Sequence, residues 1–286
     1  MTESILVTGA TGTVGQHAVS ALANRDADIT LGVRDPDSVR DDFASTGNLV
    51  AFDFTKPETW GTALTDVDRV FLVRPPVVDD SDITAFVDAA GRVGVSHIAY
   101  LSVLGAEKNP LIPHYRIEKH IVGVDVEHTF LRASFFMQNL LEVHRRDIVE
   151  HDEIFVPAGT GRTSFVDARD LGEVAAVVLT EPGHENRAYD LTGPEALDYN
   201  AVATIFSDVL GRSITYPQPS LLSFALRMRR HGKPLGFIAV MCGIYTTARL
   251  GLAARVTDDS RRLLDRQPRS MRDFVEDHAD DFRRDK

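Results

Sequence analysis

Short apolar runs alternate with amphipathic segments along the first half of the chain. Runs of this length, rich in Val, Ile and Leu, are typical of strands that are buried on both faces of a sheet. The predicted strands are Ile5–Thr8, Ile29–Val33, Leu49–Phe52, Arg69–Val73, His97–Leu101 and His128–Arg132. The predicted helices between them are Val14–Ala23, Pro36–Ala44, Pro57–Leu64, Ile83–Val93 and His114–Val122. Strands joined by helices pair in parallel through right-handed crossovers, so we expect an α/β fold with a doubly wound parallel sheet.

The second half of the chain has a less regular pattern, and helical segments dominate it from Pro219 onward. We expect residues 1–150 to form the sheet domain, to which later segments, about 165–195, return. Residues 151–286 are expected to form a smaller, mixed but mostly helical region. Ligands of doubly wound sheets bind at the carboxyl ends of the strands. We therefore expect the helical region to cover these ends and to contact the substrate.

A glycine-rich turn follows the first predicted strand and opens the first predicted helix. Its glycines have the spacing Gly-x-x-Gly-x-x-Gly, at Gly9, Gly12 and Gly15. In such a turn the first glycine permits a tight bend, the second lets the backbone approach a pyrophosphate, and the third lets the helix pack closely. Because the N–H groups at a helix N-terminus bind phosphate, we predict a dinucleotide site here. The residues of the turn that we expect to contact the cofactor are Gly9, Thr11, Gly12, Thr13, Val14 and Gly15.

The residues after the second predicted strand bear on the choice of cofactor. An arginine at this strand tip accommodates the 2′-phosphate of NADP, whereas a carboxylate there binds the ribose hydroxyls of NAD. Arg34 takes the tip and Asp35 follows it. This order favours NADP(H) and leaves NAD(H) open.

Further cofactor contacts are expected after the third and fourth predicted strands, and at Ser102 after the fifth. Asp53 and Phe54 follow the third strand, where a carboxylate either accepts a hydrogen bond from the adenine amino group or forms a turn. Val73 and Arg74 end the fourth strand, before two prolines that either line the adenine ribose or simply terminate the strand.

Composition excludes several classes of partner. The formal net charge of −11 argues against nucleic acid and anionic membranes. Cys242 is the only cysteine, so we expect no disulfide within the chain and no metal site built from cysteines; we predict no metal.

The apolar stretch Leu235–Tyr245 is shorter than the roughly 20 residues that span a bilayer. The first predicted strand starts too early for a signal peptide, so we expect a cytoplasmic protein.

Several motifs together resemble the NmrA-like branch of the atypical short-chain dehydrogenase/reductase superfamily. The segments that carry the resemblance are Val7–Gly15, Val33–Pro36, Val70–Val73, Leu101–Ala106, Phe130–Arg132, Phe135–Asn139 and Leu191–Leu197. The resemblance implies a Rossmann domain that binds NAD(P)(H) and a smaller C-terminal substrate region. It also implies either an NAD(P)H-dependent reductase or a cofactor-sensing regulator, because the branch contains both.

The sequence leaves three alternatives for a catalytic proton donor. Ser102 follows the fifth predicted strand, and Tyr115 and Lys119 follow it as Tyr-x-x-x-Lys, which resembles the constellation of short-chain dehydrogenases. There the tyrosine donates a proton, the lysine lowers its pKa and holds the nicotinamide ribose, and the serine orients the carbonyl. The family resemblance favours His114 instead, because isoflavone-reductase relatives place a catalytic lysine at this position and other members show a glutamate near Glu118. The third alternative is that no side chain donates a proton.

The expected activity is NADPH-dependent reduction of a small, flat acceptor such as a quinone or an enone. Phe135, Phe136 and Met137 follow the sixth predicted strand and are expected to stack on the substrate or to pack in the core. The main alternative is a non-catalytic NAD(P)-binding redox sensor that acts through a protein partner. A sugar epimerase is a weaker alternative, because the C-terminal third is apolar rather than polar. The expected partner is a small-molecule substrate, and a homodimer stays open.

Overall fold

The apolar runs of the first half pair as neighbouring strands of one parallel sheet. The sheet has seven strands in the order β3-β2-β1-β4-β5-β6-β9, and every pair of neighbours is parallel. The strands are β1 (Glu3–Thr8), β2 (Ala27–Val33), β3 (Asn48–Ala51), β4 (Arg69–Val73), β5 (His97–Val103), β6 (Glu127–Ala133) and β9 (Arg187–Leu191). The strand order reverses at β1, which creates a topological switch point between β1 and β4. The predicted doubly wound parallel sheet is therefore confirmed.

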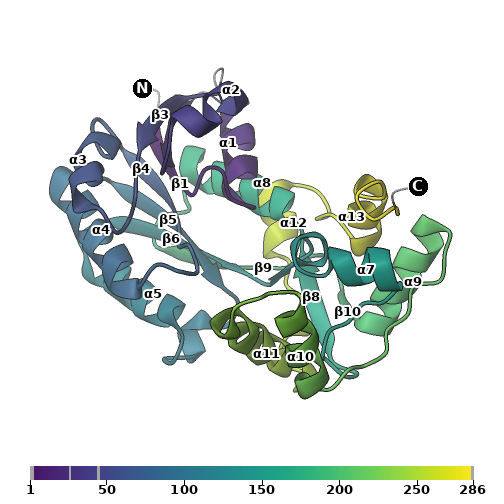
Figure 1. Ribbon diagram of the computed structural model, residues 1–286. Coiled ribbons are helices and arrows are strands. Elements are labelled where there is room, and N and C mark those ends of the chain that lie inside the picture. The colour runs from purple at the N-terminus through teal and green to yellow at the C-terminus, as the bar shows by residue number, and fades with distance from the viewer. Residues whose placement is uncertain (1–2, 26, 44–45, 285–286) are drawn as a thin grey trace. The chain divides into compact units, whose positions relative to one another are not determined.

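Helices cover both faces of this sheet, as Figure 1 shows for α1 and α8 on one side and α4 and α5 on the other. The helices of this unit are α1 (Gly15–Ala23), α2 (Arg40–Phe43), α3 (Trp60–Ala63), α4 (Asp80–Val93), α5 (Pro113–Gly123), α8 (Ala168–Thr180) and α12 (Asp259–Leu264). Helices α1 and α8 approach closely at Gly172, where a Cβ atom would lie 2.5 Å from the backbone carbon of His17. The helix predicted over Pro36–Ala44 is instead a 3₁₀ turn followed by the short α2, and Ala44 lies outside the described residues.

The structure is a computed structural model that describes residues 3–25, 27–43 and 46–284. Contacts divide this chain into two compact units. The first unit runs through Ala133 and takes in Ala168–Leu191 and Asp259–Arg266. The second unit consists of Ser134–Asp167, Thr192–Asp258 and the chain from Gln267 onward. The first continuous segment of this unit thus ends at Ala133, before residue 150, because Ser134 begins a segment that pairs in the second unit.

The second unit is built on a small three-stranded sheet. Strand β8 (Arg162–Val166) lies between β10 (Ala196–Asp198), which is antiparallel to it, and β7 (Phe135–Phe136), which is parallel to it. The helices of this unit are α6 (Asn139–Glu142), α7 (Arg145–His151), α9 (Tyr199–Leu210), α10 (Leu221–Arg230), α11 (Leu235–Arg249) and α13 (Met271–Asp277). They enclose a core that is rich in aromatic residues, including Phe165, Tyr199 and Tyr245. Within the described ranges, no helix is long and apolar enough to cross a membrane.

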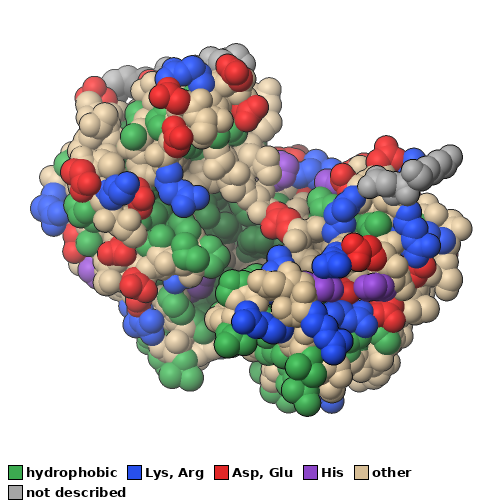
Figure 2. Space-filling model, viewed as in Figure 1, with side chains coloured by type: hydrophobic (Ala, Val, Ile, Leu, Met, Phe, Trp, Pro, Cys, Tyr) green, Lys and Arg blue, Asp and Glu red, His purple; other side chains and the backbone are tan. Residues whose placement is uncertain are grey.

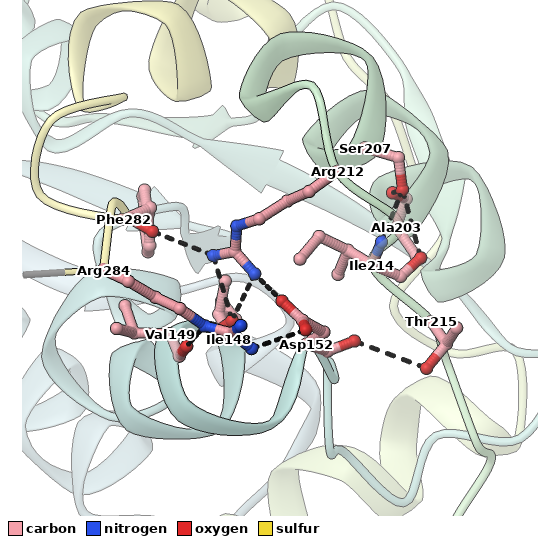
Figure 3. A network of polar contacts seen from close by, with 10 residues as sticks. All are labelled: Ile148, Val149, Asp152, Ala203, Ser207, Arg212, Ile214, Thr215, Phe282 and Arg284. Carbon is pink, nitrogen blue, oxygen red and sulfur yellow. Dashed lines mark hydrogen bonds and ion pairs between the residues drawn. The ribbon is translucent and has the colours of Figure 1, made fainter. Parts of the chain in front are cut away.

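Two arginines fix the C-terminal segment of the second unit to the end of α7 (Figure 3). Arg212 pairs with Asp152 and donates hydrogen bonds to the carbonyl oxygens of Ile148, at 3.2 Å, and Phe282, at 2.9 Å. Arg284 also binds Asp152, at 2.5 Å. Asp152 ends α7 in the left-handed conformation, with φ of 57°. Cations at a helix C-terminus stabilise its free carbonyl groups, so this network caps α7.

Candidate functional site

The glycine turn lies at the switch point of the sheet, directly after β1. Gly9 has a positive φ of 61°, and the N–H of Gly12 donates a hydrogen bond to the carbonyl oxygen of Gly9 at 2.9 Å. A Cβ atom at Gly15 would lie only 2.0 Å from that same oxygen. Any other residue at position 15 would push α1 away from the turn, so the tight packing requires glycine here.

The first turn of α1 is suited to bind an anion. Within the described residues, it contains no acidic side chain and no side chain caps it. Thr11 and Gly12 are exposed, Thr13 is half-buried, and Val14 and Gly15 are buried. A Cβ atom built at Gly12 would meet only the Gly9 carbonyl oxygen, at 3.2 Å, so the outer side of the turn is open. The turn therefore fits the diphosphate of a dinucleotide, which N–H groups at a helix N-terminus bind well.

The two residues at the tip of β2 differ in what they already bind. The Asp35 carboxylate accepts a hydrogen bond from the N–H of Asp37 at 3.2 Å and so closes a local turn. The exposed Arg34 guanidinium forms no hydrogen bond or ion pair with any described residue. One oxygen of Asp35 is thus engaged by the backbone of Asp37, whereas the whole Arg34 guanidinium is available to an anion.

Asp53 and Phe54 follow β3, where Asp53 stabilises a turn and the Phe54 ring packs in the core. One oxygen of Asp53 accepts hydrogen bonds from the N–H and the hydroxyl of Thr55, at 2.9 and 2.8 Å. These bonds lower the pKa of Asp53, the backbone bond most. The ring of Phe54 packs edge-on against Phe52 and Phe86, with centroids 4.8 and 5.3 Å apart, and is 4% exposed. The Phe54 side chain is thus part of the core, which leaves only its backbone for a ligand.

Val73 and Arg74 lie at the end of β4, beside the glycine turn. The buried hydroxyl of Thr8 accepts a hydrogen bond from the N–H of Val73 at 2.8 Å and donates one to the carbonyl of Phe71 at 3.0 Å. These bonds tie the ends of β1 and β4 together. The Nε atom of Arg74 is buried and has no hydrogen-bond partner among the described residues. A buried donor without a partner is costly, and a ligand would satisfy it.

Ser102 lies in a closed polar cluster between β5, β6 and α5. Its hydroxyl donates a hydrogen bond to Glu118 at 2.6 Å, and its side chain is almost fully buried. Glu118 is also buried and binds Arg132 through both carboxylate oxygens, at 2.6 and 3.1 Å. Arg132 further pairs with Glu107 at 3.3 Å. Ser102 is therefore committed to Glu118, and this geometry favours a structural role over contact with a substrate.

His114 forms a second polar pair at the start of α5. Its Nδ1 atom lies 2.8 Å from the hydroxyl of Tyr100, and the two rings stack with centroids 5.7 Å apart. Burial, helped by the nearby Arg74 charge, lowers the pKa of His114 to about 4. Burial likewise raises the pKa of Tyr100 well above its usual value. At neutral pH both rings are uncharged, and the tautomer of His114 decides which of the two groups donates this hydrogen bond.

Tyr115 and Lys119 lie one turn apart on α5, as their spacing predicts. The Lys119 ammonium lies over the face of the Tyr115 ring, 5.8 Å from its centroid, rather than at the hydroxyl. Lys119 is exposed and Tyr115 is half-buried. The pair therefore has the geometry of a weak cation–π contact on the helix surface.

The residues predicted to contact a substrate belong to the second unit and differ in burial. Met137 is 1% exposed and packs beside Gly193, so it is a core residue. Phe135 packs against Phe165 and Tyr245, with centroids 5.8 and 5.7 Å apart. Phe136 is half-buried. Of the three, Phe136 is the one whose ring is least engaged by the core, and its contact with a substrate stays a prediction.

Tyr100 is the site residue that sequence reasoning missed. It lies in the middle of an apolar strand, where a tyrosine indicates a core position. Its role as the partner of His114 depends on the distance between a strand and the start of the next helix. No local pattern reports that distance, although the position of Tyr100 two residues before Ser102 places both on one face of β5.

Comparison with known proteins identifies the family. The model of the NmrA-like family matches residues 1–266. The chain belongs to this family. The predicted resemblance is thus confirmed over nearly the whole chain.

Individual relatives of this NmrA-like chain match it from end to end. It is 34% identical over 283 residues to the NAD(P)H azoreductase of Xenophilus azovorans, a match that covers 97% of this chain and 99% of the relative. It is 27% identical over 266 residues to quinone oxidoreductase 2 of Escherichia coli, covering 91% and 92%. The structure of Citrobacter sp. triphenylmethane reductase complexed with NADP(H) superimposes with a TM-score of 0.85 at 27% identity, covering 96% and 99%.

Proposed function

We propose that this NmrA-like protein is an NADPH-dependent reductase of a small conjugated acceptor such as a quinone or an enone. The observation that carries the cofactor part of the proposal is the contrast at the tip of β2. The Asp35 carboxylate is engaged in a local turn, whereas the exposed Arg34 guanidinium has no partner among the described residues. A free arginine at this position suits a 2′-phosphate, which guanidinium groups bind with charge-assisted hydrogen bonds.

NADPH, when bound, would supply the hydride. In our proposal the backbone of the glycine turn, from Gly9 to Gly15, holds the diphosphate, and Arg34 holds the 2′-phosphate. The second carboxylate oxygen of Asp53, which is outside its local turn, is proposed to bind the adenine amino group. The buried Nε atom of Arg74 is proposed to donate to a cofactor oxygen at the end of β4.

His114 is proposed to orient the acceptor as a neutral ring. In our proposal the Tyr100 hydroxyl donates to Nδ1, which puts the imidazole proton on Nε2, an atom without a partner among the described residues. This N–H group can donate a hydrogen bond to a carbonyl oxygen on which negative charge develops. Because burial lowers the pKa of His114 to about 4, the imidazolium form is scarce at neutral pH and cannot be the main proton source. We therefore expect water to supply the proton.

The names of the relatives support a conjugated acceptor. An azoreductase, a quinone oxidoreductase and a triphenylmethane reductase all match this chain over nearly its full length. The net charge of −11 supports a small molecule rather than a nucleic acid as the partner. A cytoplasmic location and a homodimer stay predictions.

A panel assay tests the proposal. Oxidation of NADPH and NADH is followed with quinones, enones, azo compounds and triphenylmethane dyes, and the Kd of each nucleotide is measured without acceptor. We expect turnover of NADPH with at least one acceptor and a Kd for NADPH at least about tenfold below that for NADH. Tight NADPH binding without turnover on any acceptor would contradict the enzyme and favour the redox-sensing regulator. Equal Kd values would contradict only the role of Arg34.

A further inference from the structure

Three metal-ligating side chains meet in the second unit, and none of them belongs to the predicted cofactor or substrate sets. Asp147 and His151 lie one turn apart on α7, and His231 is the residue that ends α10. Each offers one ligand atom, and the three atoms lie within 4.8 Å of one another. Figure 2 shows histidine side chains gathered with acidic and basic ones in the region where Figure 1 draws α7.

The Asp147 carboxylate is buried, and only one of its two oxygens accepts a hydrogen bond. Its side chain is 0% exposed. The Oδ1 atom accepts a hydrogen bond from Arg227 at 3.2 Å. The Oδ2 atom has no hydrogen-bond partner among the described residues. An unpaired carboxylate oxygen away from water is costly, so this atom needs a proton or a cation.

The charges around the three side chains leave room for a cation. Arg227 binds Glu153 at 2.6 Å and stacks on the ring of Phe155, and Arg146 binds Glu150 at 2.9 Å. Arg227 also pairs with Asp147 at 3.2 Å, so these two arginines meet three carboxylates and one negative charge remains.

We propose that Asp147, His151 and His231 bind one divalent transition-metal ion, for which zinc is the natural probe. Two imidazole nitrogens and one carboxylate oxygen form an established zinc donor set, with a fourth position left for water. Ligand atoms around a tetrahedral zinc ion lie about 3.3 Å apart, given bonds of about 2.0 to 2.1 Å. The exposed side chain of His151 can close this gap, because rotamer changes of an exposed side chain are easy. The ion would join the end of α7 to the end of α10.

Zinc titration of the full chain tests the site. The protein is prepared without a histidine tag, stripped with EDTA and titrated with zinc chloride by calorimetry, and its Tm is measured with and without zinc. We expect one zinc ion per chain and a rise in Tm, since a ligand that binds the folded state stabilises it. His151→Ala and His231→Ala should each weaken zinc binding by more than the roughly 10- to 100-fold that loss of a supporting residue costs, and should abolish the rise in Tm.

His278→Ala is the matched control. His278 is a histidine of the same unit that pairs with one carboxylate, Asp281, at 3.0 Å, and belongs to no group of three ligands among the described residues. The His278→Ala variant should bind zinc as the wild type does. Asp147→Asn is a weaker test, because loss of the bond to Arg227 could itself unfold the unit. Absence of saturable zinc binding by the wild type, or stoichiometric binding that survives both histidine substitutions, would overturn the proposal.

Discussion

Two polar clusters lie along α5, and they differ in how completely their groups are paired. In the cluster of Ser102, Glu118 and Arg132, each of the three side chains binds another member of the cluster. At the start of the same helix, His114 has one ring nitrogen bound by Tyr100 and the other without a partner among the described residues. Arg34 resembles His114 in this respect, since its guanidinium forms no hydrogen bond or ion pair with any described residue, and the glycine turn is open on its outer side. We infer that closed clusters stabilise the fold and that open donors bind ligands.

The largest effect should come from blocking the open glycine turn. Gly12→Val places a branched side chain where the backbone must approach the diphosphate, so we expect NADPH binding to fall below detection by calorimetry. Folding should survive, because only one atom, the Gly9 carbonyl oxygen, lies within 4 Å of a Cβ atom at this position. Gly61→Ala, where the added Cβ atom meets nothing within 4 Å, is the control and should bind NADPH normally. Normal binding by Gly12→Val would show that the diphosphate lies elsewhere.

The next effect concerns the open donor of His114. His114→Ala should lower kcat by about 10²- to 10³-fold, the usual cost of losing one donor to a developing oxyanion, with an unchanged Kd for NADPH. Tyr115→Phe should change kcat by less than about threefold, well below the roughly 10²-fold or greater loss expected of a general acid. The reverse result would assign the chemistry to Tyr115 and Lys119.

The pH dependence of kcat sharpens the same comparison. A neutral His114 donor requires a flat profile between about pH 6 and pH 8, with a fall only as the pH approaches the pKa of about 4. An imidazolium acid with this pKa would instead lose activity as the pH rises above about 4. A rate that declines steadily from acid to neutral pH would therefore contradict the neutral-donor role.

Breaking the closed cluster should lower the stability of the protein rather than its activity. Glu118→Ala leaves Arg132 with only the longer contact to Glu107, so we expect the free energy of unfolding to fall by about 3 to 5 kcal/mol. Urea denaturation measures this loss. Glu58→Ala, at an exposed position, should stay within about 0.5 kcal/mol of the wild type. A Glu118→Ala variant of unchanged stability that has lost its activity would refute the division into closed and open clusters.

The smallest effect should come from Arg34. Arg34→Ala removes a charge-assisted contact of about 1.5 to 3 kcal/mol, so the Kd for NADPH should rise by about tenfold or more. The Kd for NADH should stay the same, because NADH has no 2′-phosphate. Parallel titrations of both nucleotides into wild type and variant measure the difference. An equal loss for both nucleotides would place Arg34 against a part that they share.

The sheet and the glycine turn could be predicted from the sequence because their signals are local. Apolar runs define the strands, and a glycine triplet directly after a strand defines the turn. The predicted helix over Pro36–Ala44 was the weaker case, since a 3₁₀ turn and one turn of helix share the same composition.

Whether each candidate side chain is buried or already hydrogen-bonded could not be predicted, because this depends on how the chain packs around it. Arg34 and Asp35 are both exposed, and the structure shows that one oxygen of Asp35 accepts a hydrogen bond from the backbone of Asp37. The Phe54 side chain and Met137 follow strands, where ligands bind, but are buried in the cores. Ser102 matched a catalytic pattern, yet its hydroxyl binds Glu118, sixteen residues further along.

The path of the chain between the units constrains how the protein is made. The chain passes from one unit to the other after Ala133, Asp167, Leu191, Asp258 and Arg266. Helix α12 of the first unit is therefore complete only when 264 of 286 residues have been synthesised, although the glycine turn of that unit is made at the start of the chain. Domains generally fold as units during synthesis. Neither unit can therefore finish folding before most of the other has been synthesised. No continuous gene fragment encodes one unit alone.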